Sequence, residues 1–167
     1  MTRIGLLSDT HSFLDPGVMD HFGECDEIWH AGDIGDLDVI ARLEKLKPVR
    51  AVFGNIDDKA IQQKFPEDWW AEVEGLLVWM THIGGSPPNY NPRVKKILNE
   101  KKPGLFICGH SHILKIMGDK ERNMLFVNPG AAGNHGFHHM KTLVRFEIHQ
   151  KEIKNMEVIE LGRRGHL

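Results

Sequence analysis

The stretch GLLSDTHS, residues 5–12, joins an apolar run to a group of polar side chains. Residues 3–8 have the composition of a short buried β-strand, and Asp9 and His11 follow at its end. Asp15 then precedes a proline, the pairing of a helix N-cap with the first helical position. The start of the chain therefore predicts a strand, a polar loop and a helix.

The same alternation continues along the first third of the chain. Residues 26–30 and 49–53 favour strands, and Asp36 is suited to cap a helix between them that continues to about Leu46. Strands that alternate with helices are typical of βαβ units. The sequence therefore predicts a partly parallel first sheet.

The rest of the chain is predicted to form a hairpin, a helix and further strands. The hairpin spans 70–74 and 76–82, the helix spans 92–100, and the next strand spans 104–108. Short polar turns then separate the expected strands of an antiparallel meander, at 113–118, 124–128, 142–149 and 153–160. Together these elements predict an α/β fold, a four-layer α/β/β/α sandwich of two mixed β-sheets flanked by helices, in one domain over 1–167.

Composition narrows the class of protein and its compartment. The 167 residues carry a net charge of -2 with interspersed basic and acidic residues, which disfavours a stable nucleic-acid partner. Cys25 and Cys108 are the only cysteines and lie far apart, as expected of free thiols in a reducing compartment. The chain lacks an apolar stretch with the length of a signal peptide or a membrane span, so we expect a cytoplasmic protein without a membrane partner.

Five segments share one placement in the predicted fold. In each, an apolar strand ends and a short run of Asp, Asn, His or Gly begins. Because ligands of open α/β sheets bind beyond the carboxyl ends of the strands, these segments are expected to converge on one site. The segments are SDTH (8–11), HAGD (30–33), FGN (53–55), MTH (80–82) and CGHSH (108–112). The candidate metal ligands that they supply are Asp9, His11, Asp33, Asn55, His82, His110 and His112.

The spacing of these residues suits a metal site. Asp9 and His11 are two positions apart, so they face the same way in an extended chain. His110 and His112 repeat that spacing. Asp33 is suited to bridge two ions with its two carboxylate oxygens. We therefore expect a site that holds more than one ion.

The donor types narrow the choice of metal. Asn55 offers a neutral amide oxygen, which limits the total negative charge of the site. Gly32, Gly54 and Gly109 allow close backbone approach or unusual dihedral angles at the turns that carry the ligands. Imidazole and carboxylate ligands without a thiolate suit Mn, Fe or Zn better than Ca.

The motifs D-x-H, GD, GN, H and GHxH, in this order, resemble those of the calcineurin-like metallophosphoesterases. The short chain and the sequence VNPG (127–130) are similar to the compact, single-domain bacterial and archaeal phosphodiesterase branch of that superfamily. The resemblance extends from Asp9 through Gly130 and into the last strands. Each motif alone is common, whereas all of them in order, each at a strand end, are specific. The resemblance implies the metallo-dependent phosphatase fold.

The resemblance also implies a dinuclear centre. One ion would be held by Asp9, His11, Asp33 and His112. The second ion would be held by Asp33, Asn55, His82 and His110. The cofactors implied are two divalent metal ions, Mn²⁺ first, with Fe, Zn or Ni as alternatives. The reaction implied is hydrolysis of a phosphoester by in-line attack of a hydroxide that bridges the ions, while the ions neutralise charge on the phosphate oxygens.

One position departs from the family pattern. The family commonly has His after the Gly-Asn motif, where it stabilises the transition state or protonates the leaving group, and this chain has Ile56 there. This absence and the family branch favour a phosphodiesterase over a monoesterase. Asp57 is the nearest polar substitute. The catalytic candidates are therefore Asp33, Asn55, Asp57 and His110, and further candidates from a loop are His135, His138 and His139.

Two more residues are candidates for contacts around the site. His30 either hydrogen-bonds a metal ligand or is a satisfied core histidine. Asn128 either holds a ligand histidine, approaches the phosphate, or belongs to an Asn-Pro-Gly turn that has no further function. The sequence leaves both choices open.

Two other functions stand beside hydrolysis of a small-molecule phosphoester. A non-catalytic scaffold on the same fold occurs in the retromer subunit that resembles this family, although its ligand set is incomplete and all seven ligands are present here. A metal-dependent nuclease would share the site, but it predicts a basic groove that the sequence does not display. Four tryptophans in a short chain leave room for a hydrophobic interface, so a homo-oligomer is a further prediction.

Overall fold

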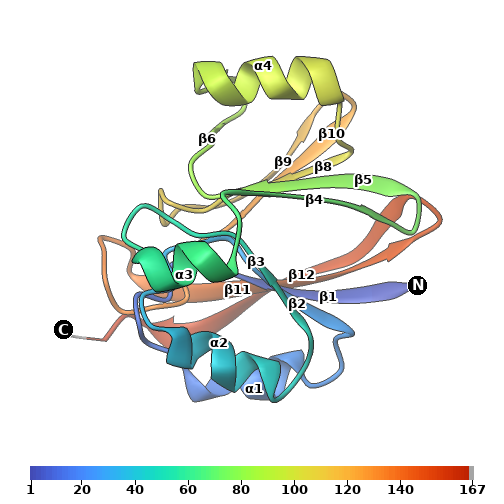
Figure 1. Ribbon diagram of the computed structural model, residues 1–167. Helices are drawn as coiled ribbons and strands as arrows, with labels where there is room; N and C mark the ends of the chain where they lie inside the picture. The colour runs from blue at the N-terminus through green and yellow to red at the C-terminus, as the bar shows by residue number, and fades with distance from the viewer. Residues whose placement is uncertain (166–167) are drawn as a thin grey trace.

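The computed structural model describes residues 1–165, which form two β-sheets between layers of helices (Figure 1). The last two residues of the domain expected over 1–167 lie outside the described residues. In spatial order, the first sheet consists of β12 (Glu152–Arg163), β11 (Met140–His149), β1 (Thr2–Leu7), β2 (Glu27–His30) and β3 (Val49–Ala51). β1, β2 and β3 are parallel, whereas β11 is antiparallel to both of its neighbours.

The second sheet has the same mixture of strand directions. In spatial order it consists of β4 (Asp68–Val73), β5 (Leu76–Thr81), β8 (Leu105–Ile107), β10 (Met124–Pro129) and β9 (Leu114–Asp119). β5, β8 and β10 are parallel, and the edge strands β4 and β9 are antiparallel to their neighbours. A small separate hairpin consists of β6 (Gly85–Ser86) and β7 (Asn89–Tyr90).

Each helix begins at a side-chain cap. The helices are α1 (Pro16–Phe22), α2 (Leu37–Glu44), α3 (Lys59–Lys64) and α4 (Pro92–Lys101). The side chains of Asp15, Asp36, Asp58 and Asn91 each accept a hydrogen bond from a backbone N–H in the first turn. These bonds satisfy N–H groups that the helix itself leaves without a partner. The two caps predicted from the sequence, Asp15 and Asp36, are confirmed.

Three apolar clusters hold the layers together. Side chains such as Leu6, Trp29 and Val127 form the core between the two sheets. α1 and α2 cover the outer face of the first sheet, where Phe22 and Ile40 are buried, and α4 covers the outer face of the second sheet (Figure 1). The four-layer α/β/β/α sandwich is therefore confirmed.

The predicted antiparallel meander is wrong. Its four strands form two hairpins, β9 with β10 and β11 with β12, which belong to different sheets. After β10 the chain crosses through residues 130–139 to the first sheet, where β11 pairs with β1. Polar turns specify hairpins, but the sheet that each hairpin joins depends on which apolar faces it covers. β11 buries Leu143, Val144 and Phe146 beside β1.

The sequence pattern also missed α3. This helix has six residues, and only Ile61 among them is buried. So short a helix contains too little apolar periodicity to be recognised. The available signal was Asp58, whose side chain accepts a hydrogen bond from the backbone N–H of Ile61.

The remaining sequence predictions concern cysteines, tryptophans and membrane spans. Cys25 and Cys108 are buried free thiols. Trp29 and Trp79 are fully buried in the core, so the predicted homo-oligomer has no support from them and stays a prediction. Within residues 1–165, every helix falls short of the length and apolar character that crossing a bilayer takes.

Candidate metal centre

All seven candidate ligands lie on loops that follow the carboxyl ends of parallel strands. Asp9 and His11 follow β1, Asp33 follows β2, and Asn55 follows β3. From the second sheet, His82 follows β5, and the loop after β8 carries His110 and His112. The convergence predicted from five segments of sequence therefore has its physical basis in the parallel strands of both sheets.

The loops do not have the extended geometry that the spacing predicted. Asp9 and His11 have φ values of 53° and 45°, and those of His110 and His112 are 70° and 62°. All four values lie in the left-handed region, and in the first loop the backbone of Asp9 and His11 packs against a neighbouring loop. The N–H of Asp9 donates to the carbonyl of Gly32, and the N–H of His11 donates to that of Asp33.

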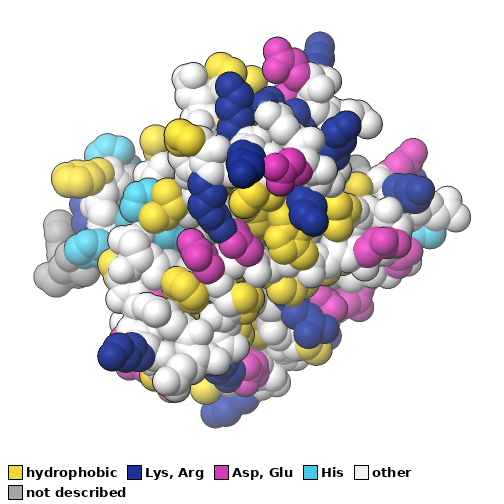
Figure 2. Space-filling model, turned by 45° about the horizontal axis from the view of Figure 1, so that its top comes forward, with side chains coloured by type: hydrophobic (Ala, Val, Ile, Leu, Met, Phe, Trp, Pro, Cys, Tyr) yellow, Lys and Arg dark blue, Asp and Glu magenta, His cyan; other side chains and the backbone are white. Residues whose placement is uncertain are grey.

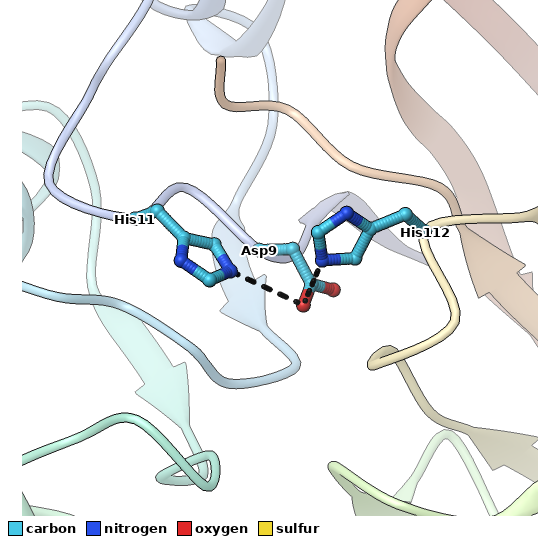
Figure 3. Close-up of side chains that lie close together, drawn as sticks. All are labelled: Asp9, His11 and His112. Carbon is cyan, nitrogen blue, oxygen red and sulfur yellow. Dashed lines mark ion pairs between the residues drawn. The ribbon is translucent and has the colours of Figure 1, made fainter. Parts of the chain in front are cut away.

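Asp9, His11 and His112 form the first donor group (Figure 3). The Nε2 of His112 lies 3.1 Å from Oδ1 of Asp9, and the Nε2 of His11 lies 3.9 Å from the same oxygen. In Figure 3 both rings point toward that carboxylate, from loops far apart in the sequence. One carboxylate oxygen is therefore the common point of this group.

The other oxygen of Asp9 is held by the protein. Oδ2 accepts a hydrogen bond from the hydroxyl of Ser8 at 2.6 Å and one from the backbone N–H of His110 at 3.1 Å. Gly109 makes this approach feasible, because a Cβ there would lie 2.2 Å from Oγ of Ser8. These bonds fix the carboxylate so that Oδ1 faces the two imidazoles. Sequence reasoning missed Ser8, whose signal was a hydroxyl directly before an Asp at a strand end.

Asp33, His82 and His110 form the second donor group. Oδ1 of Asp33 accepts a hydrogen bond from the backbone N–H of Ile56 at 3.1 Å. Oδ2 lies 3.2 Å from Nε2 of His82 and 3.4 Å from Nε2 of His11. Oδ2 of Asp33 therefore lies between the two groups, and bridging of two ions by both of its oxygens stays a prediction.

The environment of His82 fixes its tautomer, and the His82 and Asp33 side chains shift each other's pKa. Nδ1 of His82 lies 2.7 Å from the carbonyl oxygen of Ala31 and donates to it, so the deprotonated Nε2 of the neutral ring faces Asp33. Burial acts to raise the pKa of Asp33, but the His11 and His82 side chains outweigh burial and hold that pKa far below its usual range. Burial acts to lower the pKa of His82, and Asp33 and Asp9 outweigh it, so that pKa is raised.

Asn55 lies beside the exposed member of the second group. Its Oδ1 is 3.0 Å from Nδ1 of His110, and both side chains are exposed. The amide oxygen predicted as a metal ligand is therefore adjacent to a predicted imidazole ligand. Figure 2 shows several histidine side chains at one side of the molecule, next to hydrophobic side chains, and another histidine at the opposite edge.

The donor atoms fit divalent ions. Among the described residues, Oδ1 of Asp9, Nε2 of His11 and Nε2 of His82 are buried polar atoms that make no hydrogen bond. Buried polar atoms without a partner are costly, and cations bound in the two donor groups would satisfy all three. The carboxylate and imidazole donors suit a transition-metal ion such as Mn, Fe or Zn.

His30 and Asn128 hold the loops in place. The buried His30 accepts a hydrogen bond at Nδ1 from the backbone N–H of Gly32, at 3.1 Å, and its Nε2 lies 3.0 Å from Oγ1 of Thr10. Burial lowers its pKa to about 3, so the ring is neutral. Asn128 donates from Nδ2 to the carbonyl of Gly109 at 2.9 Å. Both side chains therefore contact loop residues that are adjacent in sequence to candidate ligands.

Asp57 occupies a different place from the one the sequence suggested. Its carboxylate accepts hydrogen bonds from the backbone N–H groups of Ile34, Gly35 and Gly54, at 3.2, 2.8 and 2.7 Å. With both oxygens bound to loop amides, the side chain holds the Asp33 and Asn55 loops together. The geometry therefore supports a positioning role for Asp57 in place of a proton donor.

The loop between β10 and β11 brings histidines to the first donor group. The ring of His135 stacks on His11 with a centroid distance of 4.7 Å. The ring of His138 meets His112 edge-on at 5.2 Å, and its Nε2 lies 2.8 Å from the carbonyl oxygen of Gly133. His139 is exposed. Two of the three loop histidines predicted from the sequence therefore contact candidate ligands.

Comparison with known proteins gives the family. The model of the calcineurin-like phosphoesterase superfamily domain matches residues 2–151. The chain belongs to the calcineurin-like phosphoesterase superfamily. A probable metallophosphoesterase of Methanothermobacter thermautotrophicus is 31% identical over 133 residues, which are 77% of this chain and 76% of that protein. The resemblance drawn from the motifs is thereby confirmed.

Solved structures with low sequence identity share the fold. An archaeal phosphodiesterase is 21% identical and superposes with a TM-score of 0.74, covering 94% of this chain and 99% of its own. Chaetomium thermophilum Vps29 is 15% identical with a TM-score of 0.76, covering 96% of this chain and 97% of its own. Since one is described as an enzyme and the other bears the name of a vacuolar protein sorting protein, the fold alone does not decide the function.

Proposed function

We propose that the chain is a dinuclear metal-dependent phosphoesterase, and specifically a phosphodiesterase of small molecules that acts as one domain. The observation that carries the proposal is the pair of donor groups that meet at Oδ2 of Asp33, together with the buried donor atoms that lack a hydrogen bond. A purely structural cluster would pair those atoms with each other or with backbone groups.

The proposal assigns the ligands as the family pattern implies. The first ion would be held by Asp9, His11, Asp33 and His112. The second ion would be held by Asp33, Asn55, His82 and His110. When bound, two divalent ions lower the pKa of a shared water and neutralise charge on the phosphate oxygens. The donor set favours Mn²⁺, with Fe, Zn or Ni as alternatives.

The protein's own contribution is to orient these donors before substrate arrives. Ser8 and the backbone of His110 fix the Asp9 carboxylate, and the carbonyl of Ala31 keeps a proton on Nδ1 of His82. Loop contacts through Asp57 and Asn128 keep the ligand loops together. Such contacts around the ligands preserve ring orientation and tautomer, on which metal affinity depends.

The proposed preference for diesters rests on the family branch and on Ile56. This apolar side chain is 47% exposed at the position where the family commonly has a histidine. A side-chain acid contributes about 10²–10⁴-fold to rate in general, and most for poor leaving groups. We therefore propose that aryl and other activated diesters are hydrolysed faster than alkyl monoesters.

The test is hydrolysis of bis-(p-nitrophenyl) phosphate by metal-free protein to which Mn²⁺, Zn²⁺, Ni²⁺ or Fe²⁺ is returned. We expect turnover that requires the ion and that is fastest with Mn²⁺, and slower release from p-nitrophenyl phosphate. A folded protein that binds metal but shows no metal-dependent turnover of the diester would contradict the proposal.

A protein-binding scaffold is the second candidate, and the structural similarity to Vps29 is the observation that favours it. On that alternative the metal would be dispensable for the biological role. An Asp9→Ala protein whose metal content falls toward zero, but which still supports the role of the native protein in cells, would favour the scaffold. Loss of that role together with the metal would favour the enzyme.

A further inference from the structure

A cavity of about 310 Å³ lies beside the exposed side of the metal centre. It is lined by the candidate ligand His110 and, among other residues, by Ser111, Ser86, Lys115 and Ile113. Its volume is at the lower end of the range of about 300–1,000 Å³ that small-molecule sites occupy. A substrate whose phosphate is bound at the metal centre would therefore have this cavity next to it.

The charged side chains that line the cavity are of one sign only, which is positive. Among the described residues that line it, Lys115 is the only Lys or Arg, and none is Asp or Glu. Nζ of Lys115 donates to Oγ of Ser86 at 3.1 Å and to the carbonyl oxygen of Pro87 at 3.3 Å. Within residues 1–165 this half-buried ammonium group forms no salt bridge. A buried lysine elsewhere, Lys141, is paired with Asp15.

The protein holds Lys115 in a defined relation to the metal centre. Lys115 lies on β9 directly opposite Asn128 of β10. The side chain of Asn128 donates to the carbonyl of Gly109 and to Oγ of Ser111, on the two sides of His110. The same pair of strands therefore supports the ligand loop and presents the ammonium group. An ammonium group without a carboxylate partner in a partly desolvated wall favours an anionic ligand.

We propose that this cavity binds the ester group of the substrate that is not released in the reaction, here called the arm. Lys115 would select an arm that ends in an anionic group. The inference rests on the proposed phosphodiesterase activity and deepens it by defining the substrate class: small phosphodiesters with a second negative charge, on a carboxylate or a phosphate, away from the scissile phosphorus. Ser86 keeps the ammonium group at the wall. Ile113, which lines the cavity and is exposed, provides an apolar surface for the intervening carbon chain.

The experiment uses a series of alkyl p-nitrophenyl phosphates whose arms of two to six carbons end in a methyl, a carboxylate or a phosphate. All release p-nitrophenol, so leaving-group chemistry is constant and only the arm varies. For the full chain with Mn²⁺, we expect kcat/KM to be roughly tenfold higher for an anionic arm of suitable length than for the methyl arm, through KM. The carboxylate and phosphate arms show which anion is preferred.

The variants separate this inference from a general effect of charge. Lys115→Met is expected to remove the preference for anionic arms, and Lys115→Arg, which keeps the charge, to retain most of it. Lys45→Met removes an exposed lysine from the end of α2 and is expected to change nothing. Circular dichroism and thermal unfolding show that the variants are folded.

The possible outcomes distinguish the two proposals. If the wild-type protein hydrolyses none of the esters with any of the ions, the proposed function fails. If it hydrolyses the esters with a methyl-terminated arm in the presence of metal but shows no preference for an anionic arm, only the cavity assignment is overturned. The same holds if Lys115→Met keeps that preference.

Discussion

The two donor groups of the metal centre differ in how firmly the protein holds them. In the first group, Asp9 is fully buried and its Oδ2 is fixed by two hydrogen bonds. In the second group, His82 is 3% exposed and fixed through Ala31, whereas His110 is exposed and contacts the exposed Asn55 beside the group. One side of the centre is therefore buried and preorganised, whereas the other side ends in two solvent-exposed side chains.

This difference indicates where the substrate approaches. Ordering exposed side chains on binding costs conformational entropy, so the second group is expected to bind its ion less tightly than the first. The cavity lined by Lys115 adjoins the exposed His110, on the same side as the weaker group. A site of this kind combines a fixed ion with a side that adapts to the substrate.

The largest expected effect comes from removing the oxygen that the two groups share. Asp33→Ala is expected to lower metal-dependent hydrolysis by about 10³-fold or more, because charge stabilisation of the reacting phosphate is lost at both ions. The measurements are kcat and metal content. Asp38→Ala, which removes an exposed carboxylate on α2, is the control. Retention of activity within tenfold in a folded Asp33→Ala protein would show that Asp33 is not shared.

The next effect separates the two groups. His110→Ala is expected to weaken binding of the looser Mn²⁺ ion by at least about 100-fold and to leave the tighter ion bound. This effect is larger than that of losing a residue that only supports a metal ligand through a hydrogen bond. His112→Ala is expected to weaken the tighter ion. Calorimetric titration of the metal-free variants measures both ions. If both variants weakened the same ion, the division into two groups would be wrong.

A smaller effect is expected from a residue that supports the loop between the groups. Asn128→Ala removes the hydrogen bonds to Gly109 and Ser111 while leaving every ligand in place. Metal affinity is expected to fall about 10–100-fold, with the reaction still dependent on Mn²⁺. Asn99→Ala, an exposed position on α4, is the matched control. An unchanged affinity in Asn128→Ala would mean that the loop keeps its shape without this side chain.

Most of the candidate metal ligands could be predicted from the sequence. They follow predicted strands, and the βαβ alternation indicates that the strands of the first third of the chain are parallel. These patterns predicted that seven residues would meet, and the structure brings their loops together. Spacing alone failed for Asp9 and His11, whose left-handed conformations depend on hydrogen bonds to a loop some 20 residues away. Local periodicity contains no information on such contacts.

Side-chain orientation was the second limit of sequence reasoning. Asp57 follows Asn55 closely enough to suggest a catalytic acid, but backbone N–H groups from two loops surround its carboxylate. Lys115 belongs to no recognisable sequence motif. That its charge is unpaired follows only from the tertiary structure, in which β9 lies next to β6. Both cases depend on which groups of the folded chain surround a side chain, and tertiary structure decides this.

The smallest expected effect concerns pH and the firmly held pair of the second group, His82 and Asp33. Because the folded protein raises the pKa of His82, its contribution to stability is present below the unfolded-state pKa of about 6.5 and is lost as pH rises through the folded-state value. Because the pKa of Asp33 is lowered, its contribution is present above about 3.9 and is lost as pH falls through the folded-state value.

Metal-free protein should therefore gain most from this pair at about pH 4–6.5, whereas metal binding needs a deprotonated Nε2 and strengthens as pH rises. Urea unfolding of metal-free wild type and of His82→Gln at about pH 5.5 and 8.5 isolates the pair, because other titrating groups are common to both proteins. We expect the variant to lose more stability at the lower pH. An equal loss of stability at the two pH values would mean that His82 stays neutral in the metal-free protein. The negative charge of Asp33 would then be compensated only when the metal ion is bound.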